Sequence, residues 1–437
     1  MKKILLLVLI FNFIFLNSAF SYCVNVDFFN RFNDTYLEKY IELALLNNHE
    51  LKQANYKVEQ YRNEIKTQFS KELPELSVSS NYLGAHFPKN DYNFFLRQNS
   101  YILPLRASYE PDLLLKNRDK TKLQKKIYYS KLANQKGVYI SLLTDVASAY
   151  VNILLMDYLI SNQKKIIQNQ LLKTTYETQK FKFGIINQTD LNETIEKLKN
   201  EEMIFEGLEK NLKTTLYNFS VLIGESPENF SEIKRGKIET FDYQKEFPKE
   251  INSNIIWQRP DIEEIENELK ASKIDITIAK KEFFPNFNIT GFLVFDTAGS
   301  GNFFSWNSSF AYLLAGLTQD VFKGGYKIAN LKIKKARFQE LMEKYKQTDL
   351  IAIKEINNAL NIIDKDTINQ NLSKEKLELE KNNLKNASKR LQKGTISKYD
   401  FLENKITLKE KERIFISAKA MRLIDYFTLY KAVGGAI

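Results

Sequence analysis

The side chains that could do chemistry are few in this sequence. It contains one cysteine, Cys23, and two histidines, His49 and His86. This set offers no Cys/His zinc spacing and no disulfide bond within the chain. We also find no phosphate-binding glycine loop, no metal-ligand cluster and no nucleophile beside a base. The sequence therefore predicts a protein that is not an enzyme and has no metal or other cofactor.

Two short turns stand out instead, at 183–188 and 393–397. Gly184 and Gly394 can take a positive φ and so end a helix at each turn. Asn187 and Ser397 have side-chain oxygens that can cap the helix that returns. Each turn is therefore predicted to be the tip of a helical hairpin.

Carboxylates follow both turns at the same spacing. Asp190 and Glu193 follow the first turn, and Asp400 and Glu403 follow the second. Taken alone, Asp190 and Asp400 are best interpreted as favourable negative charges in a first helical turn.

The elements that must position these turns are long helices. The chain has 437 residues but only 15 glycines and 8 prolines, with no proline between Pro111 and Pro227 or after Pro285. Unbroken helices are therefore predicted at 114–182 and 323–392, each of roughly 70 residues and about 100 Å long. A mean hydropathy of −0.38 excludes a membrane protein made of many apolar helices.

The net charge of +11 could indicate a nucleic-acid partner. Lysine, glutamate and asparagine are, however, interspersed along the helical stretches, and no dense basic block occurs. This pattern is typical of solvated helix faces, so no nucleic-acid partner is predicted.

The first residues resemble an export signal. Lys2 and Lys3 precede an apolar stretch, and small residues precede a cleavage position after Ser21. Residues 1–21 are therefore predicted to be a secretory signal peptide, with a membrane anchor as the alternative. Cys23 allows lipidation, although Tyr22 stands where a lipobox has a small residue.

The remainder repeats one plan. Pro74 aligns with Pro285, and the two glycine turns align in the same order. We predict a first repeat at 22–224, a linker at 225–257 and a second repeat at 258–437. Each repeat has the order helix, strand, strand, very long helix, tight turn, helix.

Period-two patterns place the strands at 75–85, 98–112, 286–297 and 308–320. Each has one apolar face, which is typical of strands in a membrane barrel. The segments between them, 85–97 and 297–307, are rich in turn residues. Four strands cannot close a barrel, and open edges are not tolerated in lipid, so several chains must share one barrel. Hairpins packed on helices in a soluble protein are the alternative.

Four motifs carry a resemblance to a known family. They are Gln258-Arg259-Pro260-Asp261-Ile262, Phe283-Phe284-Pro285 with Ile289-Thr290-Gly291, Leu317–Gly325, and Leu429–Gly435. Together, and in this order, they resemble the TolC-like outer-membrane efflux factors of the drug and metal efflux branch. The resemblance covers roughly residues 36–435.

This resemblance implies a homotrimer in which a twelve-stranded barrel lies in outer-membrane lipid and a helical tunnel extends into the periplasm. It implies an exit duct for small molecules, with a periplasmic adaptor protein and an inner-membrane efflux pump as partners. It also implies that Gly184, Asn187, Gly394 and Ser397 lie where the adaptor binds.

The same resemblance places Asp400 and Glu403 at acidic gate positions, with Asp190 and Glu193 as their counterparts in the first repeat. Two departures occur at strand-to-helix junctions: Leu115 stands where the family usually has glycine, and Asp320 where proline is common. Neither is expected to change the fold.

Two alternative functions stay open. A type I protein-secretion duct would have the same fold and a different cargo. A structural coiled coil of the periplasm would have the helices but no pore.

Overall fold

A computed structural model describes residues 27–84, 100–228, 233–243, 253–296, 304–306 and 309–436. The predicted signal peptide and Cys23 lie outside these residues, as does most of the two predicted turn segments. The chain divides into two compact units. Unit 1 comprises residues 1–55, 134–262 and 348–437, and unit 2 comprises residues 56–133 and 263–347. Both units therefore draw on both halves of the sequence.

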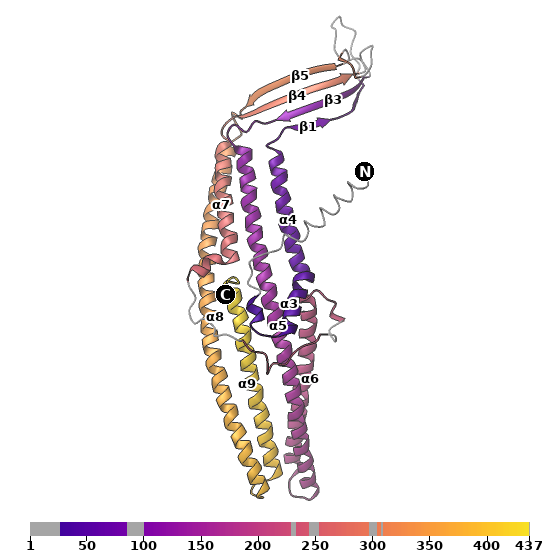
Figure 1. Cartoon of the computed structure of the whole chain (residues 1–437), viewed down its shortest axis with the longest axis vertical. Helices are drawn as coiled ribbons and strands as arrows, with labels where there is room; N and C mark the ends of the chain where they lie inside the picture. The colour runs from indigo at the N-terminus through magenta and orange to yellow at the C-terminus, as the bar shows by residue number, and fades with distance from the viewer. Residues whose placement is uncertain are drawn as a thin grey trace. The chain divides into compact units, whose positions relative to one another are not determined.

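The helices have nearly the predicted bounds (Figure 1). The first half contains α2 (Asp27–Asn30), α3 (Thr35–Asn47), α4 (His49–Ser70), α5 (Lys116–Lys182) and α6 (Gln188–Leu222). The second contains a 3₁₀ helix, η2 (Ser253–Gln258), then α7 (Pro260–Lys281), α8 (Tyr326–Gln392) and α9 (Lys398–Ala432). Lengths match between the halves: α4 and α7 have 22 residues, α5 and α8 have 67, and α6 and α9 have 35.

The strands of unit 2 form one antiparallel sheet (Figure 1). They are β1 (Glu75–Val78), β2 (Asn81–Leu83), β3 (Ser100–Tyr109), β4 (Asn286–Asp296) and β5 (Ser309–Thr318). The order is β1-β3-β4-β5, and β2 also pairs with β3. The sheet is therefore four strands wide, because β1 and β2 follow one another along the same edge of β3.

The single strand predicted at 75–85 is interrupted, and Pro104 explains the interruption. Both β1 and β2 pair with β3 in one continuous register, so residue 79 lies opposite Pro104. The Ser79 N–H donates to the Pro104 carbonyl at 3.1 Å, but Pro104 has no N–H to return a bond. The ladder therefore breaks at this point without a change of register.

The pairing register sorts the sheet's side chains onto two faces. Leu105 of β3 lies opposite Val78 and Leu293, and Leu293 lies opposite Ala311, so all four share one face. This apolar face consists of Leu76, Val78, Tyr82, Tyr101, Leu103, Leu105, Ala107, Tyr109, Phe287, Ile289, Gly291, Leu293, Phe295, Ser309, Ala311, Leu313, Ala315 and Leu317. The opposite, mixed face includes Glu75, Ser77, Asn81, Arg106, Ser108, Asn286, Asn288, Thr290 and Thr318 among apolar and aromatic residues.

The two sequence departures lie at the ends of this sheet. Leu115 has a φ of 56°, so the backbone adopts the left-handed turn that glycine would favour, at a cost of about 1–2 kcal/mol. Asp320 forms ion pairs with Lys323 at 2.7 Å and Lys327 at 3.6 Å. The hydrogen bond from Lys323 lowers the pKa of Asp320. Neither departure changes the fold, as predicted.

Ion pairs connect the helices of unit 2. The Lys281 ammonium of α7 lies 2.5 Å from the Asp119 carboxylate of α5, which is mostly buried. Asp275 of α7 pairs with Lys334 of α8 at 2.8 Å. The helices that lead into the sheet are therefore joined to one another by charge as well as by packing.

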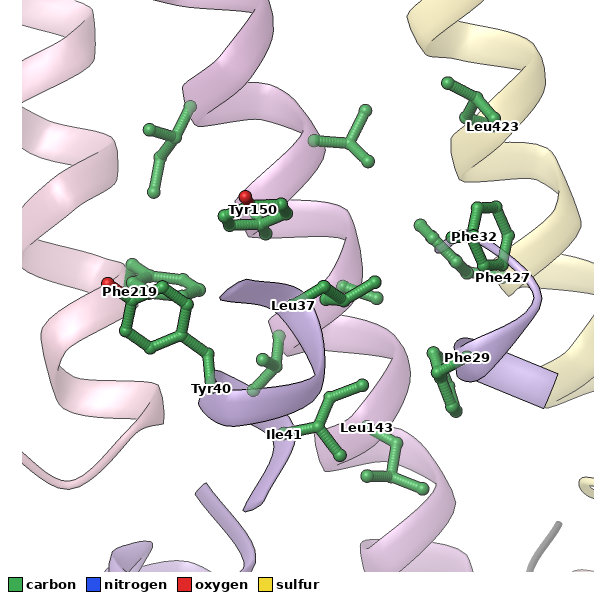
Figure 2. Packing of buried hydrophobic residues seen from close by; sticks show 14 of the residues in the cluster. Phe29, Phe32, Leu37, Tyr40, Ile41, Leu143, Tyr150, Phe219, Leu423 and Phe427 are labelled. Carbon is green, nitrogen blue, oxygen red and sulfur yellow. The ribbon is translucent and has the colours of Figure 1, made fainter. Parts of the chain in front are cut away.

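Aromatic side chains fill the core of unit 1 (Figure 2). Phe29 stacks on Phe427 of α9 with 5.9 Å between ring centroids, and Phe32 lies 4.9 Å from the same ring. Tyr40 of α3 meets Phe219 of α6 edge to face at 5.1 Å. These contacts join α2 to α9 and α3 to α6, and Tyr150 of α5 lies 6.1 Å from Tyr40 in the same core.

One stretch of α5 is apolar enough to cross a membrane, the only such helix among the described residues. More than half of that stretch, 56%, is buried inside the protein. Residues such as Leu143, Val146 and Tyr150 belong to the core of unit 1. The apolar stretch is therefore explained by core packing.

A buried hydroxyl joins three segments of this core. The Tyr150 hydroxyl lies 3.1 Å from both carboxylate oxygens of Asp34 and accepts a 3.1 Å bond from the Gly236 N–H. Asp34 is also the N-cap of α3, since its carboxylate accepts from the N–H groups of Tyr36 and Leu37. Tyr150 therefore connects α5 to the start of α3 and to the linker.

Substituting phenylalanine for Tyr150 is expected to lower the free energy of unfolding by about 1–3 kcal/mol. The change keeps the ring but leaves the half-buried Gly236 N–H without its acceptor. Urea unfolding in detergent, followed by circular dichroism, measures the loss. Tyr56, which is 70% exposed, supplies the control. Equal effects of Tyr150→Phe and Tyr56→Phe would contradict the assigned role of the hydroxyl.

Two of the sequence motifs meet in unit 1. The buried Arg259 guanidinium donates to the Ala432 carbonyl at the end of α9, at 2.5 Å. It also lies 2.7 Å from carboxylate oxygens of both Asp261 and Glu355. Gly434, with a φ of 68°, packs so closely that a Cβ there would lie 2.9 Å from the Arg259 Cα. We call Arg259, Asp261, Glu355, Ala432 and Gly434 the C-terminal clamp.

Candidate functional site

The two predicted tips have the same backbone hydrogen bonds. The Ile185 N–H donates to the Lys180 carbonyl and the Gly184 N–H to the Phe181 carbonyl, both at 2.9 Å. In the second tip, Thr395 and Gly394 repeat this pattern. This is a Schellman motif, which needs a left-handed residue at the helix end. Gly184 and Gly394 supply it, with φ values of 68° and 71°, as predicted.

The predicted N-caps are also confirmed. The Asn187 side-chain oxygen accepts from the Asp190 N–H at 2.9 Å, and the Ser397 hydroxyl accepts from the Asp400 N–H at 3.0 Å. Asp400 returns a bond, because its carboxylate accepts from the Ser397 N–H at 3.2 Å. The second tip is therefore closed by a complete capping box.

Asp400 and Glu403 differ in their surroundings. The Asp400 carboxylate is held by Ser397, and these hydrogen bonds, with the nearby charges of Lys180 and Arg390, lower its pKa. Glu403 instead forms an ion pair with Lys173 of α5. The Lys173 side chain is only 2% exposed, whereas Glu403 is 58% exposed. Asp400 thus stabilises its own helix, and Glu403 connects α9 to α5.

Lys173 belongs to a wider contact between α5 and α9. Its ammonium lies 4.4 Å from the centroid of the Tyr399 ring, and Lys180 lies 5.1 Å from the same ring. In the reverse direction, Lys398 of α9 lies 5.4 Å from the Tyr176 ring of α5. Such cation–π contacts contribute about 0.5–1 kcal/mol each at exposed sites and more where they are desolvated. We call Lys173, Tyr176, Lys180, Lys398, Tyr399 and Glu403 the tip cluster.

Lys173 is the buried cation of the tip cluster, and its charge depends most on having a partner. Burial, together with repulsion from Lys197, lowers the pKa of Lys173. A buried ammonium that loses its carboxylate is strongly destabilising, so Glu403 and the Tyr399 ring face are needed to hold it. The contact can hold α9 against α5, and it is lost when Glu403 moves away from Lys173.

The carboxylates of the first tip are not engaged in this way. Asp190 and Glu193 are exposed, and the part of the chain that the structure describes places no cation within ion-pair distance of either. The aligned positions explain the difference, because Asn383 stands where the first repeat has Lys173, and Thr189 stands where the second has Tyr399. Glu403 therefore takes part in the ion pair between α5 and α9, whereas Asp190 and Glu193 do not.

Sequence reasoning missed Lys173, Tyr176 and Tyr399. Lys173 and Lys180 are two helical turns apart and therefore lie on one face of α5, which could have marked them as a pair. Across the described residues, no group of three or more His, Cys, Asp or Glu is placed to hold a metal ion. The site is thus a helix–helix contact made of charges and rings.

Comparisons with known proteins agree with this architecture. The sequence profile described as "Outer membrane efflux protein" matches residues 40–225 and 252–435. The chain is 24% identical over 410 residues to the probable outer membrane lipoprotein SilC of Salmonella typhimurium, which covers 93% of this chain and 87% of SilC. It is 22% identical to the cation efflux system protein CusC of Escherichia coli K12, over 92% of this chain and 87% of CusC.

A solved structure shows the same fold. The outer membrane channel CmeC of Campylobacter jejuni superposes with a TM-score of 0.84 at 23% identity, covering 94% of this chain and 88% of CmeC. The two matched ranges of the family profile together span most of the chain and include both tips, the sheet and the C-terminal clamp. The chain therefore belongs to the outer membrane efflux protein family.

Proposed function

We propose that three copies of this chain form the outer-membrane exit duct of a tripartite efflux pump. Each copy contributes the four positions of its sheet to a twelve-stranded barrel, and its helices line a tunnel in the periplasm. The duct passively conducts small molecules, drugs or metal ions, which an inner-membrane pump delivers through a periplasmic adaptor. The family is one of channels, not enzymes, which confirms the prediction that the chain has no catalytic activity.

The observation that carries this proposal is the division of the sheet into two faces. The apolar face has the side chains that a lipid-facing surface needs, and the mixed face has those of a water-filled lumen. The strands at the two edges of the sheet, β1 with β2 on one side and β5 on the other, have one partner each among the described strands. An open edge is not tolerated in lipid, so neighbouring copies must pair with these strands.

Each subunit is proposed to consist of the two sequence repeats, 22–224 and 258–437, joined by the linker. The family profile matches the chain twice, and equivalent helices have equal lengths. The tip of each repeat is proposed to contact the adaptor, through Gly184 and Asn187 in the first repeat and Gly394 and Ser397 in the second. They lie at exposed turns that no other described element covers.

The gate is proposed to lie at the same tips. In a trimer, three tip clusters would surround the axis and hold α9 against α5 in the closed duct. Asp400 would support the start of α9, and the Glu403–Lys173 pair would be the contact that breaks on opening. Asp190 and Glu193 are exposed and available to contact the adaptor.

Substituting arginine for each of two adjacent residues, one on each face of the sheet, tests which face contacts lipid. Leu313 of β5 lies on the apolar face and Leu314 on the mixed face, and they are 76% and 64% exposed. Leu313→Arg is expected to reduce the folded protein in membranes, because arginine at the middle of a lipid-facing strand costs about 2–4 kcal/mol. Leu314→Arg should be tolerated. Quantified trimer in detergent-extracted membranes measures both, and equal losses would contradict the assignment of faces.

Planar-bilayer recording of the purified protein tests the function itself. A channel gives discrete conductance steps and runs as a heat-sensitive trimer on gels. A structural coiled coil without a pore gives neither and is recovered as a soluble protein. To separate efflux from protein secretion, the chain is expressed with its own pump and adaptor. Lower accumulation of a small dye supports efflux, and an unchanged dye level contradicts it.

A further inference from the structure

A row of four residues crosses the mixed face of the sheet at one level. The register places Ser77 of β1 opposite Arg106 of β3, Arg106 opposite Phe292 of β4, and Phe292 opposite Tyr312 of β5. The Arg106 guanidinium carbon lies 5.6 Å from the centroid of the Phe292 ring. The Phe292 and Tyr312 rings stack, with centroids 4.9 Å apart and planes inclined by 21°.

Arg106 is an unusual residue for this position. Its side chain is exposed, and the described residues place no carboxylate within ion-pair distance of it. The register places two acidic residues on this face, both at strand ends: Glu75 begins β1 opposite Ser108, and Asp296 ends β4 opposite Ile102. An arginine in the middle of a membrane strand must face water, and an ionisable residue there marks a functional site.

Its neighbours hold the cation in place without cancelling its charge. A guanidinium stacked on an aromatic face is attracted to the ring but keeps its full positive charge and its outward N–H donors. The Phe292–Tyr312 stack in turn fixes the ring on which Arg106 rests. The charge is therefore oriented over the mixed face, and no carboxylate of the described residues forms an ion pair with it.

We propose that Arg106 forms a cationic ring in the lumen of the barrel that favours the passage of anionic solutes. The proposal rests on the proposed function, because three copies around one lumen convert the single row into a ring of three arginines separated by stacked aromatic rings. Rings of arginine or lysine select for anions in other pores by the same electrostatic attraction. The partner class is thus a small organic or inorganic anion, and the aromatic stack offers a flat surface to those that are aromatic.

Cysteine chemistry tests the proposal, starting from a Cys23→Ser background that removes the only native thiol. Arg106→Cys channels are recorded in a planar bilayer under a KCl gradient, before and after a positively or negatively charged methanethiosulfonate reagent. Loss of Arg106 should shift the reversal potential toward cation preference. The positive reagent should reverse the shift, and the negative reagent should increase it.

Leu105→Cys is the matched control, because Leu105 is the adjacent residue on the apolar face. Neither water-soluble reagent should alter its currents. Arg106→Gln gives the same test without a thiol if the cysteine variant assembles poorly. An unchanged reversal potential in conducting Arg106→Gln and Arg106→Cys channels would overturn the inference alone. Absence of any conductance from the unsubstituted protein would instead count against the proposed function.

Discussion

Replacing Arg259 with alanine is expected to lower the free energy of unfolding of unit 1 by about 1–3 kcal/mol, because the buried Ala432 carbonyl loses its hydrogen-bond donor. The guanidinium is 8% exposed and donates to the Ala432 carbonyl while it contacts Asp261 and Glu355. The two carboxylates are each more than 40% exposed and become hydrated, so most of the loss comes from the buried carbonyl and the missing side chain. Thermal unfolding of the detergent-solubilised protein measures the change.

Two further substitutions define what the arginine does. Arg259→Lys keeps the charge but loses the planar fork that reaches three partners, so we expect an intermediate loss. Arg337→Ala removes an exposed arginine that pairs with Glu340, and exposed pairs contribute only about 0–1 kcal/mol. If Arg259→Ala were no more harmful than Arg337→Ala, the C-terminal clamp would have no energetic importance.

The glycine of the clamp gives an independent check. Gly434→Ala adds a Cβ that would lie 2.9 Å from the Arg259 Cα, and its φ of 68° is already unfavourable for alanine. Gly394→Ala has the same kind of strain, with a φ of 71°, but nothing within 4 Å of the added atom. The difference between the two variants therefore isolates the close approach of the C-terminus to Arg259.

Much of this fold could be predicted from the sequence because its signals are local. Helices predicted at 114–182 and 323–392 are found at Lys116–Lys182 and Tyr326–Gln392. Both tips were predictable, since Gly184 and Gly394 are the residues that a left-handed helix end requires. Alternation along β3 and β4 was enough to separate the two faces before any pairing was known.

What could not be predicted depends on contacts between distant parts of the chain. The clamp brings Arg259 to residues 432 and 434, although each motif could be found separately. Lys173 and Glu403 are 230 residues apart, and no periodic pattern connects them. The break in the first strand follows from Pro104, but only once the register has placed Ser79 opposite it.

Neutralising the Lys173–Glu403 pair is expected to increase the conductance of the closed duct. Lys173→Met and Glu403→Gln each remove the ion pair that holds α9 against α5. For Lys173→Met, which leaves only the largely exposed Glu403 without its partner, a loss of about 1 kcal/mol is expected in each subunit, which changes the ratio of open to closed state about fivefold. Single-channel recording in a planar bilayer measures the mean conductance and the open probability. Glu403→Gln leaves the buried Lys173 ammonium without its carboxylate, so it should have the larger effect, and the double variant should return to the level of Lys173→Met alone.

Asp400 separates this mechanism from a gate that depends on the Asp400 carboxylate itself, which is one of the gate positions that the family resemblance implied. Asp400→Ala removes the returning half of the capping box, so it should loosen the start of α9 by about 0.5–1 kcal/mol without opening the duct. Glu193→Gln in the first repeat, where the described part of the chain forms no cross-helix pair, should leave conductance unchanged. If Asp400→Ala raised conductance as much as Glu403→Gln did, the closed state would depend on a charge ring at Asp400. Because Glu403 contacts Lys173 whereas Asp400 bonds Ser397, the geometry favours a duct held shut by a helix-to-helix pair.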